Sequence, residues 1–360
     1  MYGKILIPST CKKTEIPCLP YKISTINFIN KNSFCIIDFC YIFIMKDFLI
    51  NGSKIIPGEN KSVILNTYKL PTKTVIEIPV HVYRSATDGP TLMLSAGMHG
   101  DETNGIEIVR KIISRNEVKE LKCGNLIVLP VINIVSFLFG SRDLPDGRDL
   151  NRCFPGNKNG SLGARVAYDL MKQIIPIIDF GVDFHTGGAK INNYPQIRCV
   201  FDFQDNIDIA NRFSAPLTID SIYREGTLRK ESAKKGKPIL VYEGGESLRF
   251  DYNAINEGIN GCLRLMNSYG MIDVEVPNNP SVRITKGTWV RAKSSGLFHF
   301  NKANGSHVDK NELLGVICNP YGEVETKIIS PVSGYVVGIN NQPVVNEGDA
   351  LVHLGLTEGN

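Results

Sequence analysis

Apolar positions along the chain alternate between runs of strand length and stretches with helical spacing. The run 91–94 is followed by five apolar residues at helical spacing between 106 and 113, which predicts a buried strand leading into a helix. The same criteria predict buried strands at 125–131, 174–182 and 238–242, a half-exposed strand at 74–83, and helices at 161–175 and 253–270. Strands interleaved with helices indicate an α/β fold with an open sheet.

The C-terminal part of the chain has a different pattern. Beyond the Pro- and Asn-containing linker 276–280, short strands alternate with glycine turns. The segment 295–298 (SGLF) matches 333–336 (SGYV), and 308–314 matches 345–351. Two copies of a strand–turn–strand unit predict a small β domain with internal pseudo-symmetry. We therefore expect a main α/β domain at 45–272 and a C-terminal β domain at 282–360.

The first 44 residues do not follow either pattern. They contain four of the nine cysteines and the apolar run 35–44, which is too short to span a bilayer and is interrupted by Asp38. No charged n-region with a small-residue cleavage site accompanies that run, as a signal peptide requires. Our hypothesis is that Met45 is the natural start and that 1–44 is a non-native or disordered extension. The alternative is one or two genuine extra strands.

Composition narrows the class of protein. The 360 residues are 42% hydrophobic and 21% charged, which is typical of a soluble protein with room for two domains. The net charge of +4 is spread without a basic block, so nothing indicates a nucleic acid or a membrane as partner. Nine cysteines without a C-x-x-C pair favour free thiols in a reducing compartment, and we expect a cytoplasmic protein. The sequence leaves homo-oligomer formation open.

Residues suited to a metal site stand at the ends of three predicted strands. His99 and Glu102 follow the strand 91–94, His185 follows 174–182, and Glu243 follows 238–242. In an open α/β sheet the carboxyl ends of the strands form the ligand crevice. Two histidines and one carboxylate, with a further carboxylate beside them, are the residues that a catalytic Zn²⁺ site needs. We predict one Zn²⁺ per chain, bound by His99, Glu102 and His185.

Four motifs carry a family resemblance: AGMHGDE (96–102), DGRDLNRCFPG (146–156), DFHTGG (183–188) and VYEGGE (241–246). In this order they resemble the succinylglutamate desuccinylase/aspartoacylase family, relatives of the zinc carboxypeptidases. The resemblance runs from about residue 79 to the C-terminus. It implies a mixed sheet with helices on both faces and a zinc hydrolase that cleaves the amide bond of an N-acyl amino acid. The C-terminal β domain resembles the barrel-sandwich fold of biotinyl and lipoyl carriers, but Gly322-Glu323-Val324 stands where those carry a modified lysine.

The loop 141–156 contains three arginines, a composition that suits anion binding beside a metal site. By resemblance, Asn151 and Arg152 hold the substrate carboxylate. A further arginine polarises the scissile carbonyl, and Arg142 matches it better than Arg148, which stays an alternative. Glu243 is the expected general acid/base, with Glu246 as the fallback if the loop is out of register.

Two other functions remain open from the sequence. A metallocarboxypeptidase would use the same site on peptides, and an inactive binding protein would keep the fold without turnover. Arg198, Arg224 and Arg229 are candidate specificity residues, although surface charge explains any one of them more simply. The preferred interpretation is a zinc-dependent deacylase acting on a small N-acyl amino acid.

Overall fold

The computed structural model describes residues 45–188, 190–278, 280–323 and 325–358. The prediction for residues 1–44 lies outside this range. Contacts join Met45–Asn360 into one compact unit. Within the described ranges, every helix is too short or too polar to cross a membrane.

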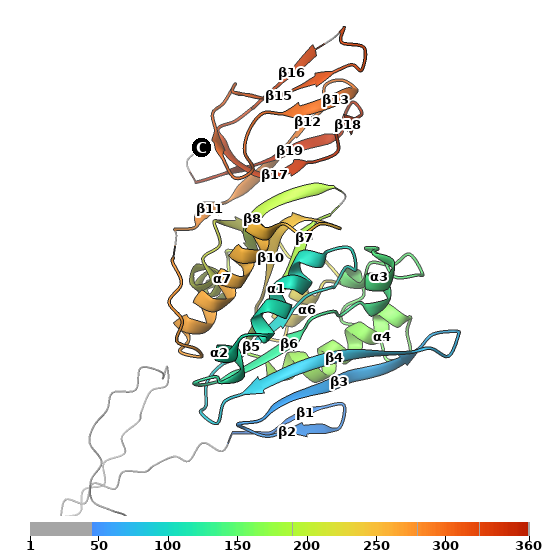
Figure 1. The fold of residues 1–360 in the computed structure, drawn as a ribbon, viewed down its shortest axis with the longest axis vertical. Helices are drawn as coiled ribbons and strands as arrows, with labels where there is room; N and C mark the ends of the chain where they lie inside the picture. The colour runs from blue at the N-terminus through green and yellow to red at the C-terminus, as the bar shows by residue number, and fades with distance from the viewer. Residues whose placement is uncertain (1–44, 189, 279, 324, 359–360) are drawn as a thin grey trace, which may run out of the picture. The chain divides into compact units, whose positions relative to one another are not determined.

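A mixed sheet forms the centre of the fold, as the resemblance implied (Figure 1). Among the described residues it has 13 strands, and its main path runs β12-β19-β17-β8-β10-β7-β5-β6-β4-β3. Strands β10, β7, β5 and β6 are parallel, whereas β4 and β3 are antiparallel to their neighbours. Strand β8 is antiparallel to β10 and parallel to β9. The strands of this first part are β1 Phe48–Ile50, β2 Ser53–Ile55, β3 Asn60–Lys69, β4 Val75–Arg84, β5 Thr91–Ser95, β6 Asn125–Leu129, β7 Phe180–Gly187, β8 Ile191–Cys199, β9 Leu217–Asp220 and β10 Ile239–Glu246.

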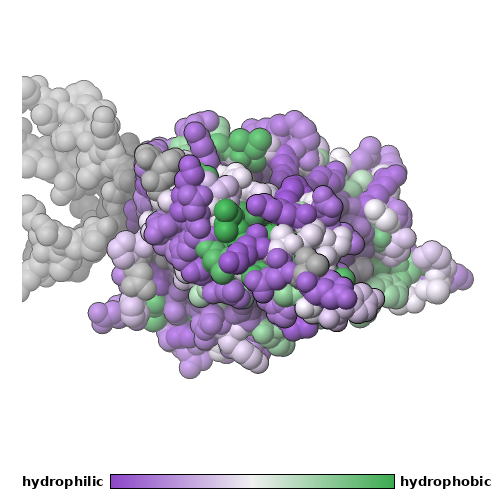
Figure 2. Space-filling model, turned by 90° about the horizontal axis from the view of Figure 1, so that it is seen from above, coloured by the Kyte–Doolittle hydropathy of each residue, from purple (hydrophilic) through white to green (hydrophobic). Residues whose placement is uncertain are grey.

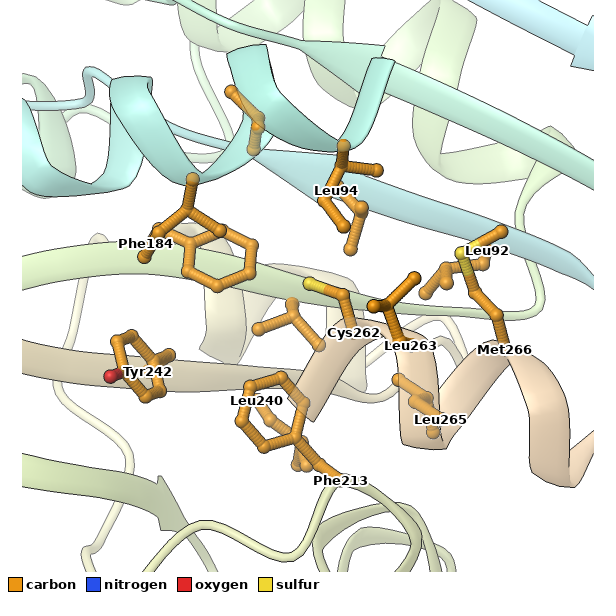
Figure 3. Packing of buried hydrophobic residues seen from close by; sticks show 14 of the residues in the cluster. Leu92, Leu94, Phe184, Phe213, Leu240, Tyr242, Cys262, Leu263, Leu265 and Met266 are labelled. Atoms are coloured by element: carbon orange, nitrogen blue, oxygen red, sulfur yellow. The ribbon is translucent and has the colours of Figure 1, made fainter. Parts of the chain in front are cut away.

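Helices cover both faces of the sheet. On one face α1, α5 and α7 pack on a core that includes Leu94, Phe184 and Tyr242 (Figure 3). On the other face α4 and α6 enclose a second core with strands β3 to β6. The helices are α1 Thr103–Ile113, α2 Asn116–Lys119, α3 Ile134–Phe139, α4 Leu162–Asp169, α5 Gln204–Phe213, α6 Leu228–Ala233 and α7 Tyr252–Ser268. The predicted helices after residue 102 and at 253–270 are confirmed.

The predicted strand 174–182 was wrong in its first half. Residues Leu170–Ile174 form a π-helical turn and Ile175–Ile177 a 3-10 turn, and β7 begins only at Phe180. Pro176 has no backbone N–H to give to a strand ladder, while Ile174 and Ile175 are buried in the second core. The apolar run therefore spans the end of a helical segment and the start of β7. His185 lies within β7, near its end, rather than after it.

The C-terminal residues form short strands, as predicted, with the repeated segments at equivalent places. One repeat gives β13, β14 and β15, and the other gives β17, β18 and β19, with their apolar residues in one shared core. These strands are β11 Val282–Ile284, β12 Lys286–Arg291, β13 Gly296–Phe300, β14 His307–Val308, β15 Leu313–Cys318, β16 Glu325–Ile329, β17 Gly334–Asn340, β18 Val344–Val345 and β19 Ala350–Leu356. Five of them, β11, β12, β14, β17 and β19, belong to the central sheet, which they join where β17 pairs with β8 and β11 pairs with β9. The face seen in Figure 2 is mostly hydrophilic, with apolar residues in small groups.

Candidate metal centre

His99, Glu102 and His185 converge at the carboxyl ends of β5 and β7. Ligand atoms of the three side chains all lie within 4.8 Å of one another, and the residues are only 2%, 2% and 5% exposed. The Nδ1 atoms of His99 and His185 face opposite oxygens of Glu102, at 2.8 and 2.9 Å. Two imidazole nitrogens and a carboxylate around one point are a donor set that Zn²⁺ accepts.

Each histidine is oriented by a carboxylate on its other nitrogen. His99 Nε2 lies 3.0 Å from Asp149 Oδ1, and His185 Nε2 lies 2.8 Å from Asp183 Oδ2. Asp183 in turn accepts a hydrogen bond from the Ser95 hydroxyl at 2.7 Å. A carboxylate on the outer nitrogen places the proton there and leaves Nδ1 as the basic ligand atom, the arrangement typical of metal-binding histidines.

The carboxylates and imidazoles of this cluster shift each other's pKa values. Burial alone raises the pKa of Glu102, but His99 and His185 outweigh it and hold that pKa well below its usual range. Burial likewise lowers the histidine pKa values, but Glu102 for His99 and Asp183 for His185 outweigh it and raise them. With Asp149, three carboxyl groups surround two imidazoles. Arg142 pairs with Glu102 and Asp149, and the more exposed Arg152 lies 3.8 Å from Asp149. A divalent cation fits this excess of buried negative charge.

Two glycines explain why the chain turns so closely after β5. Gly97 has φ +62°, a conformation that favours glycine. A Cβ atom at Gly100 would lie 1.9 Å from the backbone carbon of Ser136, so only glycine lets this loop pass the start of α3. Within this turn the side chains of His99 and Glu102 lie 2.8 Å apart.

Arg142 is brought to the cluster and Arg148 is not. The Arg142 guanidinium donates to Glu102 Oε1 at 3.0 Å and to Asp149 Oδ2 at 2.9 Å. In the described part of the chain, the ion pair of Arg148 is with Asp146, at 3.8 Å, and its side chain is 63% exposed. The geometry therefore brings Arg142, and not Arg148, to His99, Glu102 and Asp149.

Asn151 and Arg152 lie in a short 3-10 turn, Leu150–Arg152, next to the same cluster. Asp149 begins this turn by accepting a hydrogen bond from the Asn151 backbone N–H at 2.7 Å. The Asn151 side-chain oxygen accepts from the Leu228 N–H at 3.0 Å, which ties the loop to α6. Arg152 is 43% exposed and lies 3.8 Å from Asp149, so its guanidinium is accessible to an anion.

Glu243 stands beside His185 on the neighbouring strand. The two residues are paired in the register of β10 and β7, so their side chains point to the same face of the sheet. Glu246 instead pairs with Gly187, and its carboxylate accepts from Asn341 at 2.6 Å and pairs with Arg249 at 3.0 Å. Glu246 is buried, with 9% of its surface exposed, and its carboxylate has these two partners.

The structure adds residues that the sequence did not rank. Glu243 Oε2 accepts from Asn193 Nδ2 at 2.5 Å, and its other oxygen lies 3.3 Å from the Arg198 guanidinium. Arg229 is buried and donates to backbone carbonyls, so surface charge does not explain it, whereas Arg224 is exposed. Pairing between β8 and β10 brings Asn193 and Arg198 to Glu243, and no local motif in the sequence predicts that pairing.

Comparison with known proteins identifies relatives of this chain. The model of the succinylglutamate desuccinylase/aspartoacylase catalytic domain matches residues 88–269, about half of the chain. The chain is also similar to the N-alpha-acetyl-L-2,4-diaminobutyric acid deacetylase of Halomonas elongata, with 28% identity over 254 residues, 66% of this chain and 73% of that protein.

Solved structures show the same fold. A succinylglutamate desuccinylase from Silicibacter superposes with a TM-score of 0.74 at 24% identity, covering 87% of this chain and 100% of the other. The ectoine utilization protein EutE (DoeB) of Ruegeria pomeroyi, in its product-bound form, gives 0.73 at 22% identity, with coverage of 84% and 97%. The matched region contains all four motifs and the residues that could hold a metal. The chain belongs to the succinylglutamate desuccinylase/aspartoacylase family.

Proposed function

We propose that the protein is a zinc-dependent hydrolase that cleaves the amide bond of an N-acyl amino acid. The observation that carries this proposal is the convergence of His99, Glu102 and His185, with the outer nitrogen of each histidine held by a carboxylate. A Zn²⁺ ion bound by these three residues would supply an activated water at neutral pH and polarise the substrate carbonyl.

Glu243 acts in this proposal as the general acid/base. Its carboxylate takes a proton from the attacking water and later gives a proton to the leaving nitrogen of the amide. The proposal is supported by the position of Glu243 at the carboxyl end of β10, opposite His185 in register. Glu246 is less suited, because it pairs in register with Gly187 rather than with His185, and its carboxylate is held by Asn341 and Arg249.

Arg142, Asn151 and Arg152 bind the substrate. Arg142 stabilises the negative charge that develops on the carbonyl oxygen, since its guanidinium already lies against Glu102 and Asp149. The accessible guanidinium of Arg152 binds the carboxylate of the amino acid. Asn151 binds the same carboxylate through its side-chain NH₂, while its side-chain oxygen holds the loop against α6 by accepting from the Leu228 N–H.

The deacetylase relative guides the choice of substrates to test. Purified protein is assayed with N-acetyl amino acids, including N-acetyl-2,4-diaminobutyrate, and with free and C-terminally blocked peptides. We expect turnover of the N-acyl amino acids that is lost on chelation and restored by Zn²⁺. Faster turnover of free peptides would instead support a metallocarboxypeptidase, and no turnover of any compound with zinc bound would support an inactive binding protein.

We place the enzyme in the cytoplasm. Cys153, Cys199, Cys262 and Cys318 are free thiols, which agrees with a reducing compartment. Burial raises the pKa of the Cys199 thiol to about 12, so this thiol is unreactive at neutral pH.

A further inference from the structure

The side chain of Asn193 connects the proposed acid/base to the C-terminal strands. Asn193 lies in β8, between Gly245 of β10 on one side and Gly338 of β17 on the other. Its Nδ2 donates to Glu243 Oε2 at 2.5 Å, and the residue is only 5% exposed. A carboxylate attracts the amide NH₂ and repels the amide oxygen, so this contact selects one orientation of the Asn193 amide.

Two glycines lie close to the Asn193 amide. A Cβ atom at Gly338 would lie 2.6 Å from Asn193 Oδ1, and one at Gly187 would lie 3.3 Å from Asn193 Cγ. Neither glycine has a positive φ, so neither is required by a left-handed backbone conformation. Both positions need the absence of a side chain. At Gly338 the nearest atom is the Asn193 amide oxygen, whereas at Gly187 a Cβ atom would lie 2.0 Å from the Ile191 carbonyl oxygen.

Further contacts fix β17 and its neighbours against the same part of β8. The Asn341 backbone N–H donates to Lys190 O at 3.0 Å, and the Asn341 side chain donates to Glu246. The Asn304 side chain donates to the backbone oxygen of Asn192 at 3.1 Å. The C-terminal segment therefore holds both β8 at Asn193 and the end of β10 that carries Glu243.

We propose that Asn193 is a positioning residue for Glu243, and that Gly338 of the C-terminal segment keeps it in place. This inference rests on the proposed function, because it assumes that Glu243 transfers the proton. Asn193 fixes one oxygen of the carboxylate by donating a hydrogen bond, and the other oxygen, 3.3 Å from the Arg198 guanidinium, is the one that would meet the reacting groups. The C-terminal strands thus contribute to proton transfer without touching the substrate.

The test is a double-mutant cycle of Gly338→Ala and Asn193→Ala, assayed with the N-acyl amino acid that the wild-type protein hydrolyses fastest. A methyl group at Gly338 displaces the Asn193 amide, so we expect kcat to fall about tenfold or more, since general acid/base catalysis contributes 10²–10⁴-fold. KM should stay within about twofold, because substrate binding belongs to other residues. In Asn193→Ala the clashing oxygen is gone, so adding Gly338→Ala should lower kcat no further.

Controls separate this inference from a general structural effect. Asn192→Ala removes the side-chain contact to Asn304 and leaves Glu243 untouched, so its kcat should equal that of wild type. Zinc content should be the same in all variants. If Gly338→Ala does not fold, Asn193→Asp decides alone: it keeps the size of the side chain but loses the donor, and a wild-type kcat would overturn the inference.

The outcomes also distinguish the inference from the proposed function. If the wild-type protein hydrolyses no N-acyl amino acid, both fall together. If Glu243→Gln is fully active, the inference falls with the role proposed for Glu243, while the hydrolase function stands. If wild type is active and Glu243→Gln is not, but Gly338→Ala keeps its kcat, only the inference falls. Equal effects of Gly338→Ala with and without Asn193 would also overturn it.

Discussion

Replacing Asp183 by asparagine tests how the histidine ligand is held. Asp183 is 2% exposed and uses both oxygens: one accepts from Ser95 and the other faces His185 Nε2 at 2.8 Å. An asparagine can keep both contacts, with its oxygen toward His185 and its NH₂ toward the Ser95 hydroxyl, which can accept. The variant therefore changes the charge and leaves the shape of the site intact.

The expected loss of zinc affinity follows from replacing a hydrogen bond to a charged carboxylate by one to a neutral amide. A hydrogen bond to a charged group contributes about 1.5–3 kcal/mol, whereas a neutral one contributes about 0.5–1.5 kcal/mol. The difference of about 1–1.5 kcal/mol weakens zinc binding by roughly tenfold. This lies at the lower end of the range of about 10–100-fold that outer partners of metal ligands usually contribute.

The assay is competition for Zn²⁺ between the protein and a chromophoric chelator of known affinity. Asp183→Asn should bind about tenfold more weakly than wild type and keep its activity at saturating zinc. The matched control is Asp179→Asn, just before the same strand, where the exposed carboxylate accepts from the Thr91 backbone N–H. Equal zinc affinities for Asp183→Asn and wild type would refute the assignment of Asp183 as the partner of a metal ligand.

Three further predictions concern catalysis, pH and packing. Arg142→Lys keeps the charge but loses the two-pronged contact to Glu102 and Asp149, so steady-state assays should show kcat/KM about a hundredfold lower. Burial, with the charge of a nearby arginine, lowers the pKa of His353 to about 4. Between pH 6.5 and 4 the unfolded chain then binds more protons, so urea titrations should show roughly 2–3 kcal/mol of stability lost on acidification, and His353→Phe should reduce this loss. At Gly105 a Cβ atom would lie 2.6 Å from Phe184 Cβ, so Gly105→Ala should lower the free energy of unfolding by about 1–3 kcal/mol, measured by the same titration.

Much of the fold could be predicted from the hydrophobic pattern. The strand 91–94 and its following helix are found as β5 and α1, because a buried parallel strand and an amphipathic helix leave clear local signals. The start of β7 could not be found this way, since the apolar residues 174–178 are equally suited to buried helical turns. Pro176 was the available signal against a strand.

The residues of the site likewise fall into those that local sequence signals predict and those that they do not. His99 and Glu102 share one turn, and the strand ends brought His185 and Glu243 into the prediction. Asp183 could also have been assigned, since a residue two positions before His185 lies on the same face of a strand.

Asn193 could not have been assigned, because its role depends on the pairing of β8 with β10 and with β17. The contact of Gly338 with Asn193 could not have been predicted either, since the two residues are 145 positions apart in the chain and are neighbours only through the pairing of β17 with β8. Long-range register of this kind is set by tertiary packing, and a single sequence carries no local sign of it.

The central claim is that His99, Glu102 and His185 bind one catalytic zinc ion. The most direct measurement is the metal content, by mass spectrometry, of wild-type protein and of His185→Ala, both purified identically without chelators. Our account predicts about one zinc per chain in the wild-type protein and a large loss in the variant. Wild-type protein without zinc, or a variant that keeps all of it, would contradict the account.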